Sequence, residues 1–91
     1  MSEAPAEGVP GHRPLYIIAG EIGRDWMRPS LHALPYLYAM RHLNQISENY
    51  GLDSGTSVVA YFLSNATHWR GDNARRLKAE LREILKGAGY V

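Results

Sequence analysis

The chain contains no cysteine among its 91 residues, and this absence excludes several kinds of chemistry at once. Without thiols there is no disulfide framework, no thiolate zinc site, no iron–sulfur cluster and no cysteine nucleophile. The length is a second limit, because a chain of this size buries roughly 60% of its unfolded surface and builds one modest core. We therefore expect a single domain and not a large enzyme fold.

The sequence also lacks a long hydrophobic run and a strong excess of charge. The longest uninterrupted apolar run is Val58 to Leu63, whereas a membrane-spanning helix needs roughly 20 apolar residues. Ten Lys and Arg stand against nine Asp and Glu, a formal charge of +1, which argues against coating nucleic acid or membrane by bulk electrostatics. The N-terminal residues have neither the basic start nor the apolar stretch of a secretory signal. These features predict a soluble, cytoplasmic protein without membrane contact.

The first residues differ in composition from the rest of the chain. Residues 1–13 are rich in proline, glycine, alanine and acids, and such a segment cannot bury enough apolar surface to offset the entropy of ordering. We therefore predict a flexible tail over residues 1–13 and a single helical domain over residues 14–91.

The spacing of apolar residues in this domain predicts an all-α fold, a compact bundle of about four short helices. The expected helices cover residues 14–27, 35–49, 54–65 and 73–86. Asp53 and Asp72 are the expected caps of the third and fourth helices, and Gly51 is the expected stop of the second. Residues 15–18 could form a strand instead, but that strand would lack an obvious partner. The third helix carries a block of six apolar residues without a polar face, which predicts burial on several sides.

A search for catalytic or metal-binding patterns finds little. No two of the four histidines have the i, i+4 spacing of a helical metal site, and no acidic cluster resembles a calcium loop. Glu21 and Asp25 share a helix face, but Arg24 stands three residues after Glu21 and Arg28 three residues after Asp25. This spacing favours solvated ion pairs. No nucleophile elbow, phosphate-binding glycine loop or dinucleotide fingerprint is present. We therefore predict a protein that is not an enzyme and needs no metal or cofactor.

The charge is distributed unevenly along the chain. Residues 70–86 hold six basic and three acidic side chains, a balance of +3, while the remainder has a balance of −2. The last helix could therefore act as the recognition helix of a small helix-turn-helix-like DNA-binding protein, with Arg75, Arg76 and Lys78 contacting phosphates. The alternative is an ordinary solvated helix face, which we favour because Glu80 and Glu83 would repel phosphate.

Aromatic residues give a second set of candidates. Trp69 and Arg70, in the turn before the last helix, could anchor an interface, or Trp69 could close the core with its indole N–H bonded to a carbonyl. We favour the second alternative. A small core cannot hide six tyrosines, and Tyr36 and Tyr38 point to different sides of their helix, so one of them should face solvent or a partner. The candidate binding residues are Tyr38, Trp69, Arg70, Arg75, Arg76 and Lys78.

Several short motifs between Ile22 and Leu85 resemble those of a known group of proteins. They are Pro35-Tyr36-Leu37-x-Ala39-Met40, Tyr50-Gly51-x-Asp53, Tyr61-Phe62-Leu63-x-Asn65-Ala66-x-x-Trp69-Arg70-Gly71 and Ala74-Arg75-Arg76-x-Lys78-x-Glu80-Leu81. This pattern is similar to that of small uncharacterised helical proteins encoded by phages of high-GC bacteria. The resemblance implies a phage-type accessory protein that binds a host or phage protein in the bacterial cytoplasm, with self-association as a further possibility, and it implies no catalytic residue.

Overall fold

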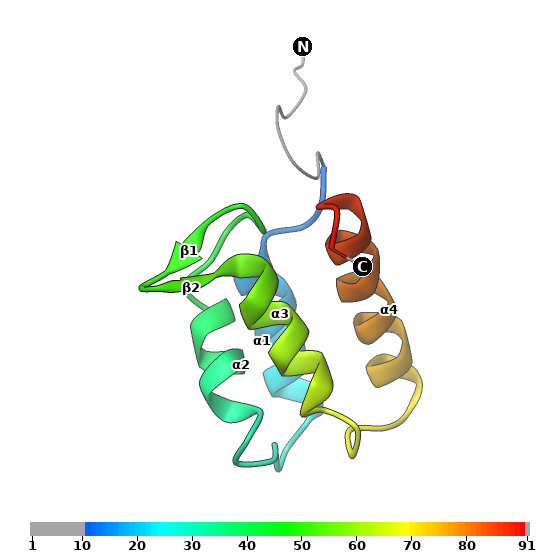
Figure 1. The fold of residues 1–91 in the computed structure, drawn as a ribbon. Coiled ribbons are helices and arrows are strands. Elements are labelled where there is room, and N and C mark those ends of the chain that lie inside the picture. The colour runs from blue at the N-terminus through cyan, green and yellow to red at the C-terminus, as the bar shows by residue number, and fades with distance from the viewer. Residues whose placement is uncertain (1–10, 91) are drawn as a thin grey trace.

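The computed structural model describes residues 11–90, and these residues form four helices and one very short hairpin (Figure 1). The elements in chain order are α1 (Leu15–Asp25), α2 (Leu34–Met40), β1 (Asn49–Tyr50), β2 (Asp53–Ser54), α3 (Gly55–Ser64) and α4 (Asp72–Gly87). The predicted all-α fold is confirmed. Residues 1–10 of the predicted tail lie outside the described residues. Within the described part, no helix has the length and apolarity that a membrane span requires.

Helix α1 follows Pro14 and buries one face of its first two turns. Leu15, Ile18 and Ile22 are fully buried on that face. The alternative prediction of a strand over residues 15–18 is wrong. The free N–H groups of Leu15 and Tyr16 at the helix start donate to the carbonyls of residues 44 and 43, at 3.0 and 2.9 Å. The start of α1 is thus capped by backbone from a distant part of the chain.

Helix α2 is shorter than its sequence predicts. It ends at Met40 instead of residue 49, and the N–H groups of His42 and Leu43 bond three residues back, which tightens the last turn. The carbonyls of Leu43 and Asn44 are needed to cap α1 and therefore cannot continue a helical ladder. Leu43 and Ile46 are nevertheless buried, as their helical spacing suggested. The expected helix stop, Gly51, instead occupies the turn between β1 and β2 with φ of +62°.

Helix α3 begins directly after the hairpin, and its cap is Ser54, not Asp53. The Ser54 side chain accepts a hydrogen bond from the N–H of Ser57 at 3.1 Å. Val58, Val59 and Phe62 are buried, and α3 contacts α2, α4 and both strands. Burial is not complete around the helix, because Tyr61 is 53% exposed.

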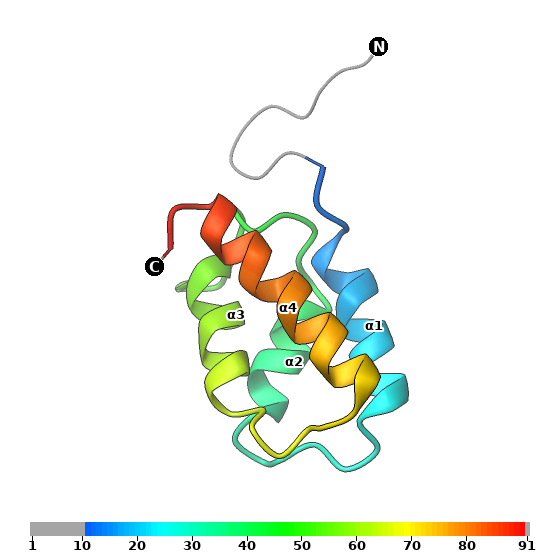
Figure 2. The same ribbon diagram turned by 90° about the vertical axis from the view of Figure 1, so that its right-hand side faces the viewer.

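Helix α4 packs against both α1 and α3 and lies in front of them in Figure 2. Its buried face consists of Ala74, Leu77, Leu81, Ile84 and Leu85. The predicted cap, Asp72, is instead the first helical residue and forms an ion pair with Arg75. Gly71, with φ of +113°, occupies the cap position. The connection from α3 to α4, residues 65–71, is longer than the three or four residues usual in a helix-turn-helix.

Candidate functional site

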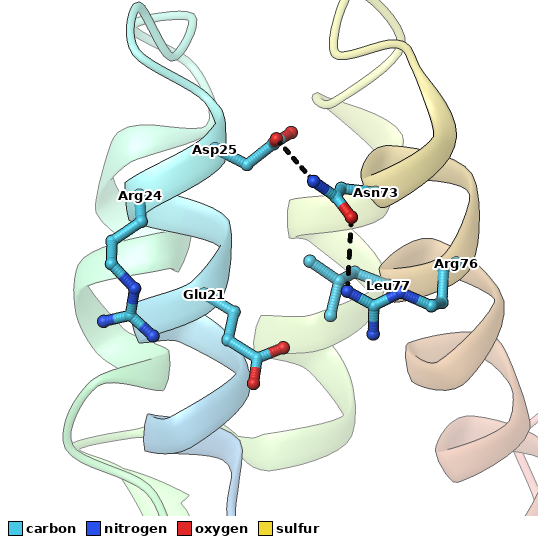
Figure 3. A pocket seen from close by; sticks show the side chains of 6 residues that line it. All are labelled: Glu21, Arg24, Asp25, Asn73, Arg76 and Leu77. Carbon is cyan, nitrogen blue, oxygen red and sulfur yellow. Dashed lines mark hydrogen bonds between the residues drawn. The ribbon is translucent and has the colours of Figure 1, made fainter.

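The first candidate site is a cleft between α1 and α4, with a volume of about 320 Å³ (Figure 3). Its lining residues are Glu21, Arg24 and Asp25 from α1 and Asn73, Arg76 and Leu77 from α4. In Figure 3 the carboxylates of Glu21 and Asp25 extend toward α4, whereas the guanidinium of Arg24 lies on the side of α1 away from α4. The cleft therefore brings together the two acids that the sequence singles out.

The Asp25 carboxylate is bonded to two donors from the other side of the cleft. Asn73 Nδ2 donates to Oδ1 at 3.0 Å, and Trp69 Nε1 donates to Oδ2 at 2.8 Å. These hydrogen bonds, first that of Asn73 and then that of Trp69, lower the pKa of Asp25. The predicted ion pair with Arg28 does not form, and Asp25 instead joins α1 to the start of α4.

The Glu21 carboxylate is held by Arg13. Arg13 donates to Glu21 at 2.7 and 3.1 Å and to Glu80 at 2.8 Å through two nitrogens, so one guanidinium bridges α1 and α4. The hydrogen bond from Arg13 lowers the pKa of Glu21. Arg13 was assigned to the tail by composition, yet it is bonded to both helices.

These two carboxylates do not have the properties of an acid catalyst. A general acid at neutral pH needs a raised pKa, whereas the pKa values of Glu21 and Asp25 are both lowered. Within residues 11–90 no three His, Cys, Asp or Glu side chains are grouped closely enough to hold a metal ion. The hydrogen bonds of these carboxylates join α1 to Arg13 and to the start of α4.

A second hollow lies at the start of α4 and has a volume of about 310 Å³. Four basic side chains line it, Arg70 from the connection and Arg75, Lys78 and Arg82 from α4, together with the small residues Gly71 and Ala74. We call this feature the basic hollow. It contains three of the predicted binding residues. Arg82, which the sequence reasoning missed, follows Arg75 and Lys78 at helical spacing, and that spacing was the available signal.

Arg76 does not belong to the basic hollow. It lies in the cleft against α1, where its guanidinium donates to Asn73 Oδ1 at 3.4 Å. One residue along a helix turns the side chain by about 100°. The predicted phosphate-contacting set of Arg75, Arg76 and Lys78 is therefore divided between two faces of α4.

Lys78, which lines the basic hollow, contacts Trp69. Lys78 Nζ donates to the Trp69 carbonyl at 2.7 Å and lies 5.6 Å from the centre of the indole ring. Burial, and then the nearby charges of Arg82 and Arg70, lower the pKa of Lys78. Trp69 is only 2% exposed and stacks on Trp26 with ring centres 5.6 Å apart. The structure thus places Trp69 in the core, with a carboxylate instead of a carbonyl accepting its N–H.

The third candidate is an apolar surface between α1 and α2. Met27 and Leu31 are 79% and 80% exposed, and Leu34 and Tyr38 are 40% and 60% exposed. A groove of about 230 Å³ lies beside them, lined in part by Met27, Leu34, Tyr38 and Arg41. We call these four exposed side chains the apolar corner. Tyr38 is the exposed member of the tyrosine pair, and Tyr36 packs against the core.

Sequence reasoning missed Met27, Leu31 and Leu34 as candidate binding residues. They stand on either side of the break at Arg28-Pro29-Ser30, where helical periodicity assigns no buried face. Apolar residues in a segment rich in turn signals were the available indication.

Comparison of the chain with family models, with curated proteins and with solved structures finds no match. The resemblance to small phage proteins stays a prediction.

Proposed function

We propose that this chain is a non-enzymatic, phage-type accessory protein that binds a host or phage protein in the bacterial cytoplasm. The observation that carries the proposal is the apolar corner, where four large apolar side chains are exposed within twelve residues of sequence and three of them, Met27, Leu34 and Tyr38, line a groove. Clustered exposed apolar surface of this kind is typical of interaction sites, whereas apolar side chains exposed singly are ordinary. Tyrosine is also enriched among residues that dominate binding energy.

The charges around the apolar corner favour a partner with acidic side chains. Arg28 and Arg41 lie in this part of the chain, and Arg41 lines the groove. The one acid in the same segment, Asp25, already accepts hydrogen bonds from Trp69 and Asn73. A partner segment that presents apolar side chains flanked by carboxylates matches this surface in both apolarity and charge.

The cellular setting in this proposal has a separate support. It rests on the motifs between Ile22 and Leu85 that resemble those of phage-encoded proteins. Met40 is the last residue of the first motif, and Tyr38 occupies its unspecified position. The partner is therefore sought among bacterial and phage proteins.

The proposal is tested by affinity capture from bacterial lysate with variants of the apolar corner. The variant Met27→Ser/Leu31→Ser removes the two most exposed members, and both changes lie outside the helices. The matched control is Leu52→Ser, which alters a fully exposed leucine at the hairpin turn. We expect the same partner to be recovered with the wild type and with Leu52→Ser, and to be lost with the double variant, and we expect cross-links from the partner to map to residues 27–41.

Circular dichroism of all three proteins must show equal melting temperatures, since the exposed positions contribute little to the core. A partner retained by the double variant would contradict the proposal, as would the absence of any partner together with a strictly monomeric chain. If light scattering shows a dimer of this chain that the double variant dissociates, the occupant is a second copy, and the proposed host or phage partner is wrong.

A further inference from the structure

The basic hollow is separate from the apolar corner and calls for its own explanation. Arg75, Lys78 and Arg82 follow one another at intervals of three and four residues, so they form one stripe along α4. From Arg75 to Arg82 the stripe rises about 10 Å along the helix axis. Arg70 extends it beyond the start of the helix, and Gly71 and Ala74 leave the space between these cations open.

The positive charge of this stripe is largely unbalanced by the rest of the described chain. Arg75 forms an ion pair with the exposed Asp72, but Lys78 donates to a neutral carbonyl. Within residues 11–90, neither Arg70 nor Arg82 forms an ion pair with an acid. The cations are also close to one another: burial lowers the pKa of Lys78 most, and the charges of Arg82 and Arg70 lower it further.

The two glutamates of α4 are directed away from the basic hollow, so among the acids of this helix only Asp72 pairs with one of its cations. Glu80 accepts two hydrogen bonds from Arg13 on the side of α4 that faces α1. Glu83 lies 3.8 Å from Lys86 in a solvated pair. The sequence argument against phosphate binding was the repulsion by Glu80 and Glu83, and the structure shows that neither of them lines the basic hollow.

We propose that the basic hollow binds consecutive phosphates of a nucleic-acid backbone without reading base sequence. Phosphates of one DNA strand follow one another every 3.4 Å along the helix axis, so a stripe of about 10 Å faces about three of them. A single small anion would contact only part of the stripe. The indole of Trp69 is buried beneath Lys78 and is not free to stack on a base, and the connection between α3 and α4 is not that of a helix-turn-helix. Phosphate contacts alone give sequence-independent, salt-dependent binding.

The test measures the binding of a fluorescently labelled duplex of mixed sequence by anisotropy at several salt concentrations. With about three phosphates contacted, log K falls with log salt at a slope of about −2.7, so affinity drops about 40-fold between 50 and 200 mM. The variant Arg75→Gln/Arg82→Gln removes two of these contacts and reduces the drop to about 3- to 4-fold. The matched control, Arg24→Gln/Arg28→Gln, removes the same charge from α1 and the segment after it and keeps the wild-type slope.

Four results would overturn the proposal. They are the absence of binding at the lowest salt, an unchanged slope in Arg75→Gln/Arg82→Gln, an equal loss in the control, and a different affinity for a second, unrelated sequence. Two competitors decide between sources of the anion. We expect inorganic phosphate, added at constant ionic strength, to displace no duplex, because it cannot span the stripe. If inorganic phosphate displaces the duplex, or if polyglutamate displaces it as effectively as unlabelled duplex does, the ligand is not nucleic acid. Since Arg75→Gln/Arg82→Gln changes neither the apolar corner nor the charges beside it, failure here leaves the lysate experiment unaffected.

Discussion

Phe62, on α3, packs against two tryptophans that lie next to two other helices. It is fully buried on α3, and its ring makes edge contacts with Trp26, at 6.2 Å, and with Trp69, at 6.3 Å. Trp26 follows α1 and Trp69 precedes α4, and the two indoles stack on each other. Offset and edge contacts of this kind stabilise beyond the apolar area that they bury. One phenylalanine thus supports the ends of two other helices.

This arrangement predicts a large cost for removing the ring. Phe62→Ala should lower the free energy of unfolding by about 3–5 kcal/mol, because it leaves a cavity among three aromatic rings. Tyr61→Ala removes a ring of similar size from the exposed side of the same helix, where it contacts only Tyr36 among the aromatic rings of residues 11–90, and should cost about 1 kcal/mol. Urea unfolding followed by circular dichroism measures both. Equal losses in the two variants would contradict this role of Phe62.

For single residues, burial was predictable from the sequence, but the hydrogen-bond partner was not. The burial of Trp69 follows from the need of a small domain to cover its core, and the sequence reasoning favoured it. Its acceptor, Asp25, lies 44 residues earlier in the chain, and the acceptors of Arg13 lie 8 and 67 residues away. Local spacing carries no information about such pairs, since they exist only once the helices have packed.

Among the elements, the start of α3 and the segment that leads into the hairpin are closely packed through their backbones. The N–H of Gly55 donates to the Glu48 carbonyl at 2.7 Å, which ties the first residue of α3 to the residue before β1. A Cβ atom at position 55 would lie 2.4 Å from the carbonyl oxygen of Ile46 and 2.9 Å from that of Glu48. Both neighbours are backbone atoms that cannot rotate away. Glycine is required here by close approach and not by an unusual φ angle.

Two glycine substitutions should therefore have opposite effects. Gly55→Ala should lower the free energy of unfolding by at least about 1–3 kcal/mol, the range for overpacking in a close-packed interior. Gly20→Ala, in the middle of α1, places its Cβ 3.6 Å from the flexible end of Arg24, and should raise the free energy of unfolding by about 0.5–1 kcal/mol. Thermal and urea unfolding check both signs. A neutral Gly55→Ala would mean that the backbone of Ile46 and Glu48 does not pack closely on the start of α3.

The existence of all four helices was predictable from apolar spacing, but the end of α2 was not. Leu43 and Ile46 continue the helical pattern and are buried as that pattern requires. The helix ends because the carbonyls of Leu43 and Asn44 accept hydrogen bonds from the first turn of α1. Backbone groups of a distant element compete with the local ladder, and this competition is invisible in residue periodicity. The basic hollow was foreseen in three of its four cations for the converse reason, since helical spacing alone defines a stripe.

For the whole molecule, the near-neutral net charge conceals faces of opposite character. The basic hollow is positive on one side of α4, and on the other side Glu21, Asp25 and Glu80 bind Arg13, Trp69 and Asn73 across the boundary with α1. The composition arithmetic excluded a protein covered with positive charge, and the fold shows why a local basic site is still possible. Glu21, Asp25 and Glu80 lie on the side where they join α1 to α4, and none of them lines the basic hollow.

The same carboxylates should make the fold sensitive to acid. The pKa values of Glu21 and Asp25 are lowered in the folded state, mainly by hydrogen bonds from Arg13 and from Asn73. Between the folded and unfolded pKa values the unfolded chain binds more protons, so the free energy of unfolding falls as pH falls. This contribution is fully present above the ordinary carboxyl values of 4.5 and 3.8 and is lost as pH drops through the lowered ones.

The variant Glu21→Gln/Asp25→Asn should therefore flatten the pH dependence of stability. Urea midpoints measured from neutral pH down to pH about 2–3 should decline less in the variant than in the wild type, and the two curves should converge at the acid end because both proteins then lack the charged contacts. Asp53→Asn is the control, since the Asp53 side chain forms no hydrogen bond or ion pair with residues 11–90. Parallel curves for wild type and double variant would show that these carboxylates do not couple α1 to α4. A decline removed equally by Asp53→Asn would assign the acid sensitivity to overall charge repulsion instead of to the cleft.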